Sequence, residues 1–416
     1  MFNIDELLHR EDFWEETRMT FMQKWTTTMH TAVDIDLICK FKDELLDRVK
    51  SREFEWGVPR KIRITKTGTS KKRIVYLFDL EQRILLGVLY RVLGYYFQDK
   101  VSDSCFSYKK GVNTLKAVNH IRSLNTDCEM YGVKLDISAY FNSVSKARID
   151  EMIEDVFKDR KDTDIYWLVR TLYDIDTVED NGVQVKEFMS LIAGTAIASF
   201  FANLCLYDMD VYFESRGIPY ARYSDDIVTF ANTEEEIQVN LNMMKDKLED
   251  YGLSINPRKY EYFNPHDDID FLGLTFNKDK VDIHKFSFEK VKAKIRKDIK
   301  KGRKKIEEGK PYDVVASAII HRFNHRTYKC YIEDKSKYGW GYYAFRYVNT
   351  DKTLREIDFY FRDRLRYLYT GRNNKANIGK VSDAKLHDLG YVSLVMMYKL
   401  FKTDFDAYCD YVSLLK

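Results

Sequence analysis

The order of strand and helix patterns between residues 133 and 262 is the feature that most limits how this chain can fold. A strand pattern ends in Asp136, a long apolar helix pattern covers 194–213, and two short strand patterns then flank residues 224–226. A capping box at Thr233 opens another helix, and a last strand pattern follows. This order predicts an α+β fold in which an antiparallel βαββαβ sheet is backed by helices on one face.

The predicted topology brings together three carboxylates that are far apart in the sequence. Asp136 ends one strand, while Asp225 and Asp226 lie at the tip of a neighbouring hairpin. Adjacent acids on a tight turn repel each other unless a cation or exposure to water relieves them. Two hard cations held by three carboxylates can activate a hydroxyl nucleophile and neutralise a triphosphate during an in-line displacement. The alternative is an Asp-rich hairpin turn that binds no metal.

Charge is distributed unevenly along the 416 residues, although the net charge is only +3. Residues 1–60 carry 9 Lys/Arg against 13 Asp/Glu, whereas residues 290–305 carry 10 basic residues and one acid. Aromatic residues follow this basic run closely. Cations that meet phosphates, interleaved with rings that stack on bases, are typical of nucleic-acid binding. A solvated lysine-rich helix face beside an aromatic core is the alternative.

The composition narrows the class of protein and its compartment. With 45% hydrophobic and 32% charged residues, the chain is expected to be soluble and globular, with neither a bilayer-spanning stretch nor a secretory leader. Its six cysteines lie far apart without a Cys-x-x-Cys pair, which disfavours a disulfide scaffold and suits a reducing cytoplasm. We therefore expect a cytoplasmic protein.

Seven segments resemble, in order, the motifs of one enzyme family. They are 66–73, 104–111, 134–144, 194–210, 223–226, 256–259 and 271–273. Over about residues 56–280 the sequence resembles the reverse transcriptases, specifically the bacterial group related to retron and group II intron enzymes. The resemblance implies a right-hand polymerase with fingers, a βαββαβ palm, and a helical thumb followed by a helical C-terminal extension.

The resemblance implies a role for each motif of the catalytic centre. Asp136 and Asp225 would be ligands of two Mg²⁺ ions, supported by Asp226 and the carbonyl of Ile137. Lys259 would protonate the pyrophosphate leaving group.

The incoming nucleotide would be held by a second set of residues. Lys66 and Arg73 would hold its triphosphate, and Phe141 would be a steric gate that crowds a ribose 2′-hydroxyl and favours deoxynucleotides. Gly194 opens the motif that lines the nucleotide. Ile192-Ala193 stands where the family has Pro-Gln, which removes an amide expected near the nucleotide and puts strict base selection in doubt.

Further residues would contact nucleic acid. The template would lie on the segment that contains Tyr108 and Lys109, the primer on a hairpin, and the duplex or a bound RNA on the basic run. The hairpin residues are Phe271, Leu272 and Gly273, and the basic residues are Lys292, Arg296, Lys300 and Arg303.

The domain division that follows is a helical extension at 1–55, fingers and palm at 56–285, and a basic helical thumb with its extension at 286–416. The last part shows no RNase H or HNH endonuclease pattern, and the Val-Thr-Gly usual in retron thumbs is missing. The tail is similar to stand-alone bacterial enzymes of the unknown-group, defence-associated and abortive-infection classes. The resemblance therefore implies an antiphage role, with a non-coding RNA template, cDNA or an RNA–DNA hybrid, and dNTPs as partners. The resemblance implies no interaction with a membrane, and it is compatible with an oligomer.

Three other functions are alternatives to templated reverse transcription. A template-independent or protein-primed polymerase of the abortive-infection type fits the missing Gln and the 30 tyrosines. A catalytically vestigial RNA-binding scaffold is disfavoured by the intact carboxylates, and an RNA-dependent RNA polymerase by Phe141. His321 and His325 have the spacing of a zinc-binding helix but lack an obvious third ligand, so a basic face is preferred.

Overall fold

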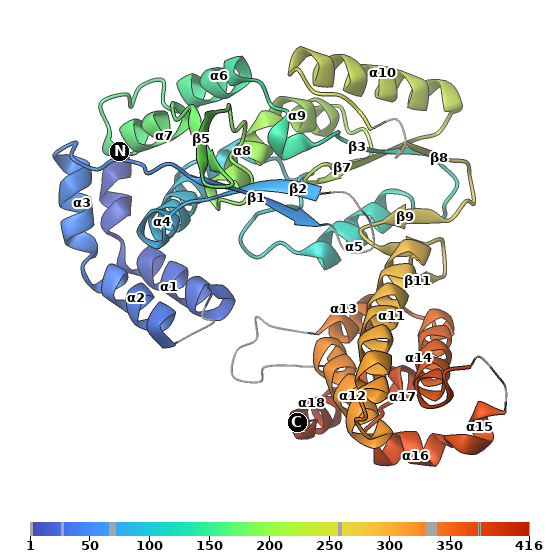
Figure 1. Cartoon of the computed structure of the whole chain (residues 1–416). Helices are drawn as coiled ribbons and strands as arrows, with labels where there is room; N and C mark the ends of the chain where they lie inside the picture. The colour runs from blue at the N-terminus through green and yellow to red at the C-terminus, as the bar shows by residue number, and fades with distance from the viewer. Residues whose placement is uncertain are drawn as a thin grey trace. The chain divides into compact units, whose positions relative to one another are not determined.

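The computed structural model (Figure 1) describes residues 3–25, 29–65, 72–256, 260–328, 339–372, 374 and 376–415. The chain divides into two compact units, Met1–Pro265 and His266–Lys416. The sequence placed a boundary after residue 285. The division falls earlier because a small sheet within 269–283 leads directly into the basic helix that follows it. The mixed α+β class predicted from the sequence is confirmed.

Four antiparallel strands form the central sheet of the first unit, in the order β6-β7-β3-β8. The strands are β3 (Tyr131–Asp136), β6 (Tyr220–Tyr223), β7 (Asp226–Ala231) and β8 (Glu261–Phe263). Val133, Leu135, Ile227 and Val228 are fully buried, as expected for apolar residues in central strands. Strands and helices follow one another in the order that the sequence indicated.

Helix α10 (Glu234–Asp250) packs against β7 and β3. The predicted capping box begins it, because the Thr233 side chain accepts from the Glu236 backbone and the Glu236 side chain accepts in return. Its buried face includes Ile237, Leu241 and Met244, which recur at the helical spacing. Gly252, with φ of 70°, follows the helix in the left-handed conformation that glycine adopts easily.

A second, more exposed sheet has the order β2-β1-β4-β5. Its strands are β1 (Arg60–Thr65), β2 (Lys72–Leu77), β4 (Thr177–Asp180) and β5 (Val183–Lys186). The backbone N–H of Tyr76 donates to the carbonyl of Ala193 at 2.7 Å, which joins β2 to the loop before α8. Gly194 (φ 103°) allows this approach, since a Cβ there would lie 2.9 Å from the Cβ of Val75.

The remaining elements of the first unit are mainly helices. The acidic N-terminal part forms a short 3₁₀ helix and three α-helices, and α1 and α2 both pack on the buried helix α4. The bounds are η1 (Ile4–His9), α1 (Glu11–Trp25), α2 (Met29–Lys40), α3 (Lys42–Lys50), α4 (Leu80–Tyr96), η2 (Gln98–Lys100), α5 (Thr114–Leu124), η3 (Tyr140–Asn142), α6 (Lys146–Val156), α7 (Asp164–Tyr173), α8 (Ile197–Cys205) and α9 (Tyr207–Ser215).

The second unit opens with a three-stranded sheet and continues as helices. Its elements are β9 (Ile269–Phe271), β10 (Leu274–Phe276), β11 (Val281–Ile283), α11 (Lys285–Glu307), α12 (Tyr312–Tyr328), α13 (Trp340–Tyr347), α14 (Lys352–Thr370), α15 (Asn377–Lys380), α16 (Asp383–Asp388), α17 (Leu394–Thr403) and α18 (Phe405–Leu414). Helix α11 packs on α12 and α14, and buried Asp298 on α11 pairs with Arg322 and Arg326 of α12. None of the described helices is long and apolar enough to cross a bilayer.

Two glycines of α4 provide a matched test of the packing of α1 on α4. A Cβ at Gly87 would lie 2.7 Å from Cγ2 of Thr17, whereas a Cβ at Gly94 meets nothing within 4 Å. Thr17 is fully buried, and its hydroxyl donates to the Phe13 carbonyl at 2.7 Å. We expect Gly87→Ala to lower the free energy of unfolding by about 1–3 kcal/mol through overpacking. Gly94→Ala should raise it by about 0.5–1 kcal/mol. Urea unfolding measures both, and equal effects would contradict the described packing.

Candidate active site

Strand pairing brings the three predicted carboxylates to one end of the central sheet. Asp136 and Asp226 are direct partners across β3 and β7. The backbone N–H of Ile137 donates to the carbonyl of Asp225 at 3.2 Å. Residues 224 and 225 form the turn between β6 and β7, and Ser224 has φ of 62°. Directly opposed residues of an antiparallel pair point to the same face, so Asp136 and Asp226 share a face of the sheet.

The chemistry of these side chains fits a hard divalent cation. Asp136 is only 6% exposed, and Asp225 and Asp226 are half-buried. Like charges directly opposite each other across two strands are destabilising, and a cation between them would relieve the repulsion. In the part of the chain that the structure describes, no three His, Cys, Asp or Glu side chains are arranged to hold a metal ion. Ligation by all three aspartates therefore stays a prediction.

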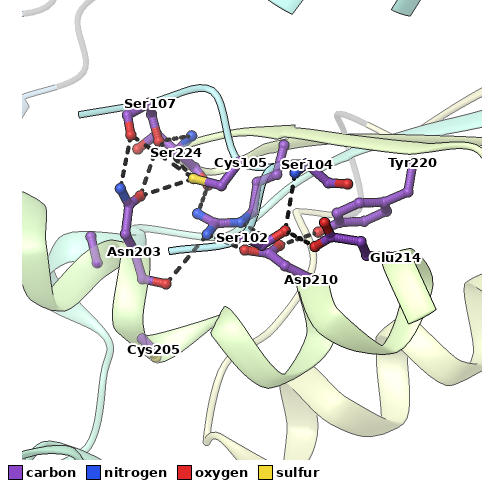
Figure 2. A network of polar contacts seen from close by, with 12 residues as sticks. Ser102, Ser104, Cys105, Ser107, Asn203, Cys205, Asp210, Glu214, Tyr220 and Ser224 are labelled. Carbon is purple, nitrogen blue, oxygen red and sulfur yellow. Dashed lines mark hydrogen bonds and ion pairs between the residues drawn. The ribbon is translucent and has the colours of Figure 1, made fainter. Parts of the chain in front are cut away.

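A hydrogen-bond network includes Ser224, the first residue of the turn at 224–225, which we call the aspartate turn (Figure 2). The N–H of Ser224 donates to Oγ of Ser107 at 2.9 Å, and this hydroxyl donates to Oδ1 of Asn203 at 3.1 Å. The side-chain amide of Asn203 donates in return to the Ser107 carbonyl at 2.8 Å. Ser107, Asn203 and Ser224 are all buried. These hydrogen bonds connect the turn to the 102–108 segment and, through Asn203, to α8.

A buried ion pair anchors the strand that leads into the turn. Arg222 and Asp210 are both 0% exposed, and the guanidinium contacts the carboxylate through Nε at 2.8 Å and Nη2 at 2.5 Å. The guanidinium also donates to the carbonyls of Ser224 and Asn203 at 3.3 Å. The phenol of Tyr220 donates to Asp210 at 2.8 Å. Burial and the Asp210 charge raise the pKa of Tyr220 well above its ordinary value, so the phenol remains a donor.

Tyr108 and Phe141, both predicted to contact substrates, touch each other. Their ring centroids lie 6.3 Å apart in an edge-to-face arrangement. The hydroxyls of Tyr108 and Ser224 are hydrogen-bonded at 3.2 Å. Burial raises the pKa of Tyr108 above its ordinary value, and the charge of Asp225 acts in the same direction, whereas the hydrogen bond with Ser224 and the charge of Arg73 lower this pKa. The side chain of Arg73, the predicted triphosphate-binding arginine, is exposed.

The remaining site residues predicted in the 1–265 part of the chain are Lys109, Lys66, Lys259 and Gly194. The ammonium of Lys109 donates to the Ser102 carbonyl at 3.0 Å and to Asp103 at 3.3 Å, so it is engaged within its own segment. Lys66 and Lys259 lie outside the described residues. Gly194 contacts β2, as described above, and its predicted contact with the nucleotide remains a prediction.

The predicted primer hairpin and basic run belong to the second unit. Leu272 (φ 49°) and Gly273 (φ 84°) form the half-buried turn between β9 and β10, while the Phe271 side chain is 1% exposed and packs inside. On α11, Arg296 and Lys300 are exposed.

Two of the predicted phosphate-binding residues on α11 instead face α14. The ammonium of Lys292 pairs with Glu289 at 2.6 Å and lies 5.2 Å from the ring centroid of Tyr360. Arg303 donates to the Leu368 carbonyl at 3.3 Å. Lysines that the sequence reasoning did not single out are exposed on this helix, namely Lys294, Lys297, Lys301, Lys304 and Lys305.

The sequence reasoning missed Ser107 and Arg222. The sequence does contain an indication for Arg222. A charged residue within the apolar β6–β7 hairpin needs a buried partner of opposite charge. Asp210, at the end of the motif that begins at Gly194, supplies this charge. No local pattern marks Ser107, whose partners at 203 and 224 are distant in sequence.

Comparisons with known proteins agree on one family. The model of the family "Reverse transcriptase (RNA-dependent DNA polymerase)" matches residues 64–276, just over half of the chain. The retron Ec86 reverse transcriptase of Escherichia coli is 26% identical over 99 residues, which are 24% of this chain and 31% of that protein. The match therefore spans less than a third of this relative. The resemblance to retron-related bacterial reverse transcriptases noted in the sequence is confirmed.

Solved telomerase structures also match. Apo telomerase from Candida tropicalis has a TM-score of 0.44 at 12% identity, covering 90% of this chain and 74% of that chain. Telomerase from Candida albicans in complex with the TWJ fragment of telomeric RNA has a TM-score of 0.43 at 13% identity, covering 90% and 70%.

The Arg222–Asp210 pair generates a stability prediction. Asp210→Asn leaves the Arg222 charge buried without its counter-ion, which should lower the free energy of unfolding by about 3–5 kcal/mol. Replacing both partners, with Asp210→Leu and Arg222→Met, should cost less because no lone charge is left buried. Exposed Asp246 on α10 is the control, and Asp246→Asn should change stability by no more than about 0.5 kcal/mol. A double variant less stable than Asp210→Asn would count against this account.

Proposed function

The chain belongs to the reverse transcriptase (RNA-dependent DNA polymerase) family, and from this premise we propose that it is an RNA-directed DNA polymerase. The observation that carries the proposal is the pairing of Asp136 with Asp226, next to Asp225, at one end of the central sheet. In this proposal the central sheet with its helices is the palm, β1 and β2 belong to the fingers, and the second unit contains the thumb and the C-terminal extension.

The carboxylates would hold two Mg²⁺ ions, with the Ile137 carbonyl as a further ligand. Bound Mg²⁺ would supply positive charge for the attacking and leaving oxygens of nucleotidyl transfer. The chain's own residues orient the substrates. Arg73 would bind the triphosphate together with Lys66, and Phe141 would exclude a ribose 2′-hydroxyl. Lys259 would donate a proton to the pyrophosphate.

The biological role that we propose is antiphage defence, by copying an associated non-coding RNA into cDNA. The resemblance of the tail to stand-alone defence-associated enzymes supports this role. A cytoplasmic location is also proposed. Among the described cysteines, Cys39, Cys105 and Cys205 are free thiols, which suits a reducing compartment.

Template-independent synthesis is a second candidate, and the loop before Gly194 favours it. Ala193 stands where the family has Gln; it is 4% exposed, and its carbonyl accepts the N–H of Tyr76. This position therefore has no side-chain amide to present to a template–nucleotide pair. Sequencing the DNA made by the purified protein separates the candidates. A faithful copy of a supplied RNA supports templated synthesis, whereas random or homopolymeric DNA supports the second candidate.

The central test is a double substitution of the turn. Asp225→Ala with Asp226→Ala should abolish Mg²⁺-dependent incorporation of radiolabelled dNTP on an RNA template with a DNA primer, because the predicted metal ligands are lost. Asp246→Asn, which removes an exposed carboxylate of α10, should leave incorporation unchanged. Incorporation that persists in the double variant, or in wild-type protein saturated with EDTA, would refute the assignment.

The exposed lysines of α11 generate a second prediction, because we propose that they bind phosphates of the duplex or of a bound RNA. Replacing Lys294, Lys297 and Lys301 by Glu should weaken binding of an RNA–DNA duplex. The slope of the logarithm of the association constant against the logarithm of the salt concentration is negative, and its magnitude should fall by about 2–3. Filter binding at several salt concentrations measures the slope. The charge-matched control replaces exposed Lys158, Lys245 and Lys352 by Glu. An equal loss in both triple variants would show a general charge effect and not a site on α11.

A further inference from the structure

Phe141 makes edge-to-face contacts with two tyrosine rings, one from the residue before it and one from the 102–108 segment. Its ring is edge-to-face with Tyr140 at a centroid distance of 5.6 Å and with Tyr108 at 6.3 Å. The Phe141 carbonyl accepts the N–H of Leu191 at 3.2 Å. Backbone and ring of this residue are therefore both held, although its side chain is only half-buried.

Tyr140 is the inner of the two tyrosines. It is 2% exposed, and its hydroxyl donates to the carbonyl of Ala202 on α8. The buried ring cannot move without disturbing α8. Tyr140 is therefore a fixed contact for the ring of Phe141.

Tyr108 is the outer tyrosine, and it is held at both ends. Its residue is 40% exposed with φ of 56°, a left-handed conformation that is uncommon outside glycine. Its carbonyl accepts the hydroxyl of Tyr90 at 2.8 Å, and its own hydroxyl is bonded to Ser224 in the aspartate turn. Ser107, the preceding residue, accepts the N–H of Ser224. The aspartate turn and the outer contact of Phe141 are thus one connected piece of structure.

We propose that Tyr108 is a positioning residue that sets the choice between deoxyribose and ribose by confining, together with Tyr140, the ring of Phe141. The inference rests on the proposed function, since it takes Phe141 to be the gate against a 2′-hydroxyl. Without the Tyr108 ring, Phe141 gains room to rotate toward the exposed side, and the space that it denies to the 2′-hydroxyl opens. The hydroxyl of Tyr108 acts separately, through Ser224, on the turn that carries Asp225.

Two substitutions separate the ring from the hydroxyl. Tyr108→Leu removes the ring edge and should lower the preference for dATP over ATP by about fivefold to tenfold, in line with the strength of an aromatic pair. Tyr108→Phe keeps the ring and should retain the preference, while kcat for dATP falls because the Ser224 bond is lost. Incorporation on poly(rU) primed with oligo(dA) gives kcat and KM for dATP and ATP, and equilibrium binding of both nucleotides gives a readout independent of chemistry.

Tyr95 on α4 provides the matched control. It is also exposed, at 51%, and its ring is edge-to-face with Phe13 at 5.8 Å, so Tyr95→Leu makes the same chemical change away from the turn and should not alter the preference. An unchanged preference in Tyr108→Leu, with dATP still incorporated, would overturn the inference and leave the proposed function standing. If wild-type protein incorporates no nucleotide and binds dATP and ATP equally, both the proposed function and the inference fail.

Discussion

A single buried ion pair supports the part of the molecule where the proposed chemistry takes place. Arg222 has no exposed surface, and its charge is tolerable there because Asp210 of α9 accepts two hydrogen bonds from it. The remaining donors of the guanidinium reach the carbonyls of Asn203 and Ser224. The helix pair that follows Gly194 and the hairpin that carries Asp225 are therefore joined through one side chain, which leaves the turn little freedom to shift relative to the sheet.

This rigidity explains how the protein can place like charges side by side. Asp136 and Asp226 face each other across β3 and β7, and like charges in directly opposed positions of two strands repel each other. The pairing of the central strands and the hydrogen bond from the Ser224 N–H to Oγ of Ser107 hold the turn in place. Strand pairing and hydrogen bonding thus hold the carboxylates close together, and a bound cation would reduce the repulsion between them. Such preorganisation is how proteins prepare a site for hard metal ions and the phosphates that accompany them.

The sequence was informative where function depends on local order and uninformative where it depends on distant partners. The strand ending in Asp136, the hairpin turn after Tyr223 and the capping box at Thr233 follow from residues close together in the chain, and the structure contains all three, although the turn is shorter than predicted and Asp226 already belongs to β7. Ser107 could not be found in this way, because its role arises from contacts with residues 203 and 224.

For the basic helix α11, the sequence indicated the charge of the helix but not which of its charged side chains are exposed. Its charge was evident, but which lysines face outward depends on the phase of the helix, and buried Ile295 and Ile299 set this phase. Lys292 and Arg303 consequently face α14. The periodicity of these isoleucines was present in the sequence and could have corrected the choice.

We propose that Asp136, Asp225 and Asp226 form a metal site held in place by the hydrogen-bond network around Ser224. Anomalous diffraction from crystals grown with Mn²⁺, a template–primer duplex and a nonhydrolysable dNTP tests this claim most directly. We predict an anomalous peak in contact with the carboxylates of Asp136 and Asp225, next to the triphosphate. A bound nucleotide with no metal at these carboxylates, or a metal bound elsewhere in the first unit, would contradict the claim.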